Sequence, residues 1–106
     1  MASSNDLRHY PRTSSPKGTF LAWQGAGLKL VSRVANLGLG GLYIRTPDPP
    51  PPGTFIQLLF DVPGGEVRAR ALVQRSTPME GMGVKFIAMH PEDRGRLGRW
   101  LNTFSV

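Results

Sequence analysis

The segment Glu66–Arg75, EVRARALVQR, alternates cleanly between apolar and polar side chains. One face carries Val67, Ala69, Ala71 and Val73, and the other carries mainly Glu66, Arg68, Arg70 and Gln74. A period of two is typical of a β-strand with one buried face and one solvated face. We therefore predict an antiparallel strand here, whose arginines form a solvated face rather than a ligand contact.

Strand patterns continue on both sides of this segment. We predict further strands over residues 19–23, 28–34, 42–45, 54–62 and 83–88, with glycine-rich turns over 25–27 and 63–65. Residues 47–52 include five prolines, which lack the N–H group that the interior of a sheet requires. This stretch is predicted to be a stiff connector, and a polyproline ligand for another domain is the alternative.

The last part of the chain changes to a helical period. Pro91-Glu92-Asp93 places a proline and two acids where the first turn of a helix favours them. An apolar stripe follows at positions i, i+3, i+4 and i+7, formed by Leu97, Trp100, Leu101 and Phe104. Six strands followed by one helix predict an all-β fold, most simply a partly closed barrel with the helix across it. Trp23 and Trp100 are expected to pack in or against its core.

Composition limits the classes of function. The 106 residues suit a single domain, and 13 basic against seven acidic residues give a net charge of +6. Ten of the bases are arginine, whose planar fork suits an anionic partner such as a nucleotide. The chain has no cysteine and two histidines, His9 and His90, so we expect no metal site, no cofactor and no catalytic activity.

The N-terminal segment is polar and rich in serine, proline and arginine. We predict a flexible arm over residues 1–16 and a folded barrel with its helix over 17–106. No run of about 18 apolar residues is present, so a membrane span is not expected. Met1–Asn5 lacks an apolar signal core, which favours a cytoplasmic protein.

Two short motifs stand out against this background. Arg8 and Arg12 lie four residues apart in the arm, and Asn36–Gly41, NLGLGG, forms a glycine-dense segment between two apolar runs. We interpret the second motif as a tight turn whose glycines adopt positive φ and expose backbone N–H groups. Two guanidinium groups beside such a turn would suit a compact anionic ligand with hydrogen-bonding edges.

Arg-x-x-x-Arg followed 24 residues later by Asn36 and then Gly41 resembles the signature of the PilZ domain. Further similarities are Pro52-Gly53 before an apolar strand, Met82–Phe86 as a late strand and Pro91-Glu92-Asp93 at the final helix. The resemblance implies a six-stranded antiparallel β-barrel with one C-terminal α-helix. It also implies binding of the bacterial second messenger cyclic di-GMP, without catalysis, and a signal passed to an unidentified effector protein.

The same resemblance implies roles for single residues. Arg8 and Arg12 would hold the phosphates and guanine edges, Asn36 would hydrogen-bond a guanine, and Gly41 would shape the turn. Gly38 stands where the family usually has serine, so one hydroxyl is missing. A hydrogen bond is worth roughly 0.5–1.5 kcal/mol, and its loss predicts binding weakened by about tenfold.

Two other functions remain open from the residues. Without the serine hydroxyl at position 38, the domain could act as a protein adaptor that binds no nucleotide. The net positive charge also fits a barrel that binds single-stranded nucleic acid, but the strands lack the row of aromatic residues on which bases stack. Nucleic acid is therefore the weaker interpretation.

Overall fold

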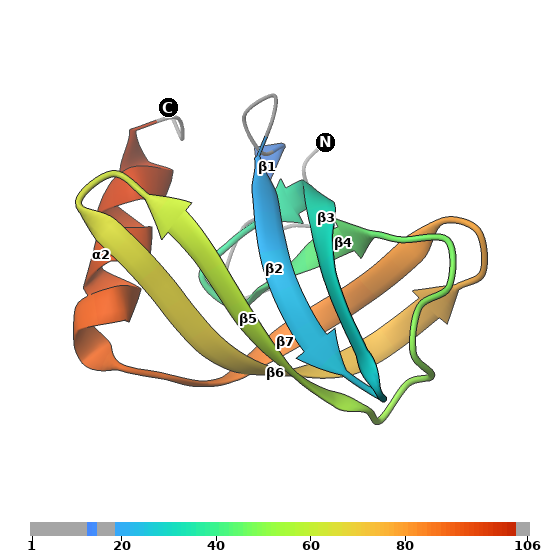
Figure 1. The fold of residues 1–106 in the computed structure, drawn as a ribbon. Helices are drawn as coiled ribbons and strands as arrows, with labels where there is room; N and C mark the ends of the chain where they lie inside the picture. Colours follow the sequence, from blue (N-terminus) through green and yellow to red (C-terminus); the bar gives the residue numbers. More distant parts are fainter. Residues whose placement is uncertain (1–12, 15–18, 104–106) are drawn as a thin grey trace.

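The computed structural model describes residues 13–14 and 19–103 of the chain. Six antiparallel strands close into a barrel (Figure 1): β2 (Phe20–Gly25), β3 (Leu28–Leu37), β4 (Gly41–Arg45), β5 (Phe55–Val62), β6 (Gly65–Thr77) and β7 (Gly81–Met89). The order around the barrel is β3-β2-β5-β6-β7-β4, and pairing of β3 with β4 closes it. The predicted six-stranded antiparallel barrel is confirmed.

A seventh strand, β1 (Thr13–Ser14), is only two residues long. It pairs antiparallel with the end of β3, where Thr13 lies opposite Leu37 and Ser14 lies opposite Asn36. Strand β2 pairs with the earlier part of β3, from Leu28 to Arg33. β1 therefore prolongs the β2 side of β3.

The core fills the inside of the barrel with side chains from all six strands. The strand predicted from the alternation over 66–75 buries Val67, Ala69, Ala71 and Val73, as expected. Trp23 is 1% exposed, and its indole N–H donates a hydrogen bond of 2.9 Å to the Ser32 hydroxyl. Because both polar groups are buried, this bond removes the cost of leaving either of them unpaired.

The helix α2 (Pro91–Asn102) begins where the sequence predicted and lies across one end of the barrel (Figure 1). The Nδ1 of His90 accepts a 3.1 Å hydrogen bond from the Glu92 N–H, which caps the first turn. Leu97 and Leu101 are buried, and Trp100 is partly buried against the same core. Phe104, the last residue of the predicted stripe, lies outside the described residues.

The proline-rich segment connects β4 to β5, as predicted. The carbonyl of Pro51 accepts hydrogen bonds from the N–H and the hydroxyl of Thr54, and the Gly53 N–H donates to the Val73 carbonyl. The Ser76 hydroxyl donates to the carbonyl of Pro50. These bonds hold the end of the connector in a turn before β5 and attach the connector to β6.

Candidate ligand-binding site

Asn36 lies in β3 rather than in the turn that the sequence predicted. A register shift between Val34 and Asn36 brings Asn36 directly opposite Tyr43 of β4, and the next pair is Leu37 with Leu42. Leu37 and Leu42 are fully buried, so burying this pair keeps the strands together up to Leu37. The Asn36 side chain is exposed on the outer face of the barrel.

The turn itself is confined to residues 38–40. The Gly38 N–H is not exposed for a ligand, since it donates a 3.0 Å hydrogen bond to the Gly41 carbonyl. The Gly40 carbonyl accepts from the Phe86 N–H at 2.9 Å. The turn is thus fastened to β4 and β7, and the Gly38 N–H is not among the backbone N–H groups that it could offer to a ligand.

Gly41 is required for space and not for backbone conformation. Neither Gly40 nor Gly41 has positive φ, contrary to the sequence prediction. Instead, a Cβ built on Gly41 would overlap the carbonyl oxygen of Val84, because β4 and β7 pass close together at this point. Gly41 therefore shapes the site by allowing two strands to approach each other.

Arg8 and Arg12, the other two predicted site residues, lie outside the described residues. Strand β1 is the nearest described segment that follows them, and it pairs with Leu37 and Asn36. Ser14, two residues after Arg12 of the first motif, therefore lies opposite Asn36, the first residue of the second motif.

Tyr43 and Lys85 join this surface from neighbouring strands. The Tyr43 ring lies over Gly81 and Gly83 of β7, and Tyr43 is half-buried there. Lys85 is exposed directly opposite Gly41. We call Asn36, Gly41, Tyr43 and Lys85 the motif face.

A second cation, Arg94, approaches the turn from the helix. The Arg94 guanidinium donates a 3.5 Å hydrogen bond to the Leu39 carbonyl. Sequence reasoning missed Tyr43, Lys85 and Arg94 as site residues. The alternation of β4 after Gly41 could have indicated Tyr43, but only strand pairing and helix docking bring Lys85 and Arg94 to the turn.

The motif face and the neighbouring Arg94 combine an amide, an aromatic ring and two cations at a surface that water can reach. Asn36 can donate and accept hydrogen bonds, and Lys85 and Arg94 supply positive charge and N–H donors. Such a surface can hold an anion that also carries hydrogen-bonding edges. Within residues 13–14 and 19–103, no group of three or more acidic, histidine or cysteine side chains could hold a metal ion.

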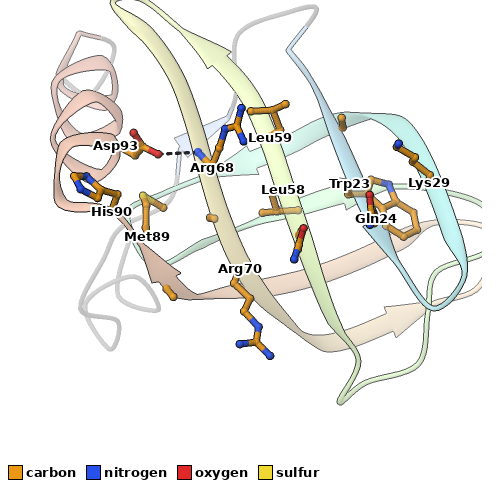
Figure 2. Close-up of a pocket in the computed structure, with 14 residues that line it drawn as sticks. Trp23, Gln24, Lys29, Leu58, Leu59, Arg68, Arg70, Met89, His90 and Asp93 are labelled. Atoms are coloured by element: carbon orange, nitrogen blue, oxygen red, sulfur yellow. Dashed lines mark hydrogen bonds between the residues drawn. The ribbon is translucent and has the colours of Figure 1, made fainter.

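A separate hollow lies on another part of the outer surface. It has a volume of about 700 Å³, crosses β2, β5 and β6 and ends at the start of α2 (Figure 2). None of Asn36, Gly38 and Gly41 lines it. In the described part of the chain, α2 is too short and too polar to cross a membrane.

Several proteins of known structure have the same fold as this chain. The PilZ domain of YcgR from Escherichia coli with c-di-GMP is 17% identical, with a TM-score of 0.71, and the alignment covers 91% of this chain and 89% of that one. PlzA of Borreliella burgdorferi in complex with c-di-GMP is 12% identical, with a TM-score of 0.71 and 92% of this chain covered. The Bacillus subtilis inhibitor of motility, MotI, is 19% identical, with a TM-score of 0.69 and 91% covered.

This chain spans 42% of the PlzA chain and 50% of the MotI chain. No curated protein matches the sequence significantly. The model of the PilZ domain matches residues 6–103, which is nearly the whole chain and includes both sequence motifs. The motif match, the six-stranded barrel and the C-terminal helix agree, and this chain belongs to the PilZ domain family.

Proposed function

We propose that this chain is a receptor module for cyclic di-GMP and has no catalytic activity of its own. The observation that carries the proposal is the pairing of β1 with the end of β3. A single peptide bond joins Arg12 to Thr13, and Thr13 lies opposite Leu37, the residue after Asn36. The arginine motif and the motif face are therefore tied together by a strand pair.

The chemistry of the motif face suits this ligand. Cyclic di-GMP has two phosphates and two guanines, and arginine forms bidentate hydrogen bonds with phosphate oxygens and with the O6 and N7 edge of guanine. Arg8 and Arg12 would supply those bonds, and Asn36 would contact a guanine. The Tyr43 ring offers an apolar surface, and Lys85 and Arg94 add positive charge at the turn.

Strand β1 already pairs residues 13–14 of the arm with β3, and binding would order the rest of the arm of residues 1–16 against the barrel of residues 17–106. The ordering would change the surface that the domain offers to an effector protein, and the charge-assisted bonds would offset its entropy cost. PlzA and YcgR were solved with c-di-GMP, which supports the same ligand here. We infer a cytoplasmic location, because a receptor must share a compartment with its messenger.

Isothermal titration of the full chain with cyclic di-GMP tests the proposal. We expect saturable heat at tens of micromolar protein, and a loss of affinity of about tenfold or more in Arg8→Ala, since hydrogen bonds to charged groups are worth about 1.5–3 kcal/mol. Arg70→Ala is the matched control and should bind normally, because Arg70 lies outside the motif face. Absence of heat, or equal affinity of Arg8→Ala and the parent, would refute nucleotide binding through the motif.

One observation favours a second function. Gly38 lacks the hydroxyl of the family serine, and its N–H is already bonded to Gly41. A domain with fewer donors at the turn could act as an adaptor that binds its partner without nucleotide. Such an adaptor would give no heat in the titration and would bind its partner equally with and without cyclic di-GMP.

A further inference from the structure

The hollow on β2, β5 and β6 is built on a row of four polar side chains. Strand pairing places Lys29 opposite Gln24, Gln24 opposite Gln57, and Gln57 opposite Arg70. Residues directly opposite one another on antiparallel strands project to the same side of the sheet. All four are exposed, and together they line one side of the hollow (Figure 2).

A second row forms an apolar floor next to the polar one. Its centre is the pair of Ala22 and Leu59, which lie opposite each other on β2 and β5. This pair is two positions along the strands from the pair of Gln24 and Gln57. Ala22 and Leu59 are half-buried, and Met89 borders the same floor near the start of α2. The small side chains of Ala22 and Ala88 leave the surface concave there. We call the polar row with this floor the cross-strand groove.

The two ends of the polar row are cations available to a ligand. Neither Lys29 nor Arg70 forms an ion pair with any carboxylate among residues 13–14 and 19–103. The Arg70 guanidinium lies 4.9 Å from the centre of the Phe55 ring, and Phe55 is 51% exposed. A ring that supports the guanidinium limits its rotation, so less entropy is lost when it binds an anion.

The other charges near the groove are already engaged. The Asp93 carboxylate accepts a 2.7 Å hydrogen bond from the Arg96 guanidinium and a 3.1 Å hydrogen bond from the backbone N–H of Arg68. Arg68 itself lies 3.6 Å from Glu66 in an exposed ion pair. The unpaired charge of the groove is therefore that of Lys29 and Arg70.

The groove suits a peptide better than a nucleotide. The Gln24 and Gln57 amides can each donate and accept, which matches the N–H and C=O of a peptide main chain. The aliphatic floor can cover a leucine or valine side chain. A base would need an open ring face, but Trp23 is 1% exposed, and the exposed Phe55 ring lies under the Arg70 guanidinium and does not line the hollow.

We propose that the cross-strand groove binds an extended acidic segment of a partner protein. Its main chain would lie over Gln24 and Gln57, and two carboxylates would reach Lys29 and Arg70. Three strand intervals separate those cations, about 14 Å, which an extended chain spans in about four residues. The proposal states which kind of segment the effector would present to this domain. Only the idea that this partner acts in cyclic di-GMP signalling rests on the proposed function.

Fluorescence anisotropy of the full chain with labelled nine-residue peptides tests the groove. The probe is a set of peptides in which two Asp or Glu residues flank three variable positions, and the matched set has Lys in place of the acids. We expect acidic members to bind at low salt and Lys members not to bind. Lys29→Glu with Arg70→Glu should weaken binding by at least about tenfold, because like charges then face each other.

Arg99→Glu is the control, since this exposed helix residue does not line the groove. Gln24→Ala with Gln57→Ala, which keeps both cations, should also weaken the acidic peptides. The proposal is overturned if no acidic member binds, if Lys members bind equally, or if Arg99→Glu weakens binding as much as the groove variants do.

Cyclic di-GMP in the same assay separates this inference from the proposed function. Peptide binding that persists in a chain giving no heat with the nucleotide would support the groove and refute the receptor. Displacement of the peptide by cyclic di-GMP in Arg8→Ala, together with amide NMR shifts at Gln24 and Gln57, would assign the groove to the nucleotide and overturn the inference.

Discussion

The motif face and the cross-strand groove lie on the same barrel but are encoded differently. Asn36 and Gly41 of the motif face lie in one short segment of the chain, which also holds Gly38, so this part of the face is visible as a motif in the sequence. The groove takes Lys29, Gln24, Gln57 and Arg70 from four strands, over 47 positions of the chain. A local motif can be found by spacing, whereas a cross-strand row exists only once the register is set.

The two regions also differ in what supports them. The turn of the motif face is fastened by backbone hydrogen bonds from Gly38 to Gly41 and from Phe86 to Gly40. The groove residues are side chains on the solvated faces of regular strands, and their removal leaves the ladder intact. A change at Gly41 should therefore affect folding and binding together, and changes in the polar row of the groove should affect binding alone.

The largest effect is expected from Gly41→Val. The new side chain would overlap the Val84 carbonyl oxygen, so β4 and β7 must move apart. Overpacking of this kind costs about 3 kcal/mol. Urea unfolding measures the loss, and Gly83→Ala is the control, because a Cβ there meets only ordinary contacts at 3.8 Å or more. Equal stability of Gly41→Val and the parent would show that the close approach of β4 and β7 does not require glycine at position 41.

Gly38→Ser should give an intermediate effect and sharpen the contrast in binding. The serine restores the hydroxyl that the family usually has, and one hydrogen bond of about 1 kcal/mol tightens cyclic di-GMP binding by about tenfold or less. Gly38→Ala controls for the added carbon. Titration calorimetry measures the affinity, while the peptide affinity of the groove should stay the same. An unchanged nucleotide affinity would mean that position 38 does not contact the ligand.

The smallest effect is expected from Asp93→Asn, at the helix end of the groove. The hydrogen bond from the Arg68 N–H, and after it that from the Arg96 side chain, hold the pKa of the Asp93 carboxyl below its ordinary value, against the opposing effect of burial. Because the folded-state pKa is lowered, the stabilisation is present above the unfolded pKa and is lost as the pH falls through the folded one.

Asp93→Asn should therefore cost about 0.5 kcal/mol at pH 7, and the difference from the parent should vanish in strong acid. Urea unfolding at a series of pH values measures it. Glu92→Gln is the matched control, since the exposed Glu92 side chain shares the first turn without these contacts. A stability difference that stays constant down to strong acid would contradict the role given to the carboxylate.

Most of the fold followed from alternation and turn residues. The strand over 66–75, the turn at Ala26-Gly27 and the start of α2 at Pro91 were all predicted correctly, because each depends on near neighbours in the chain. Asn36 was placed in a turn because glycines follow it, yet burial of the Leu37–Leu42 pair extends the strand past it. A local propensity was overridden there by a contact between strands.

The sequence by itself determined the barrel, its helix and the motif that assigns the chain to its family, since periodicity and short spacings depend only on residues that are near each other along the chain. Only the tertiary structure decided that Gly41 is needed for space, that Tyr43 and Lys85 share the motif face, and that Lys29 and Arg70 end one polar row. Those properties depend on which residues face each other across strands. A shift of one residue in register would send each of these side chains to the opposite face.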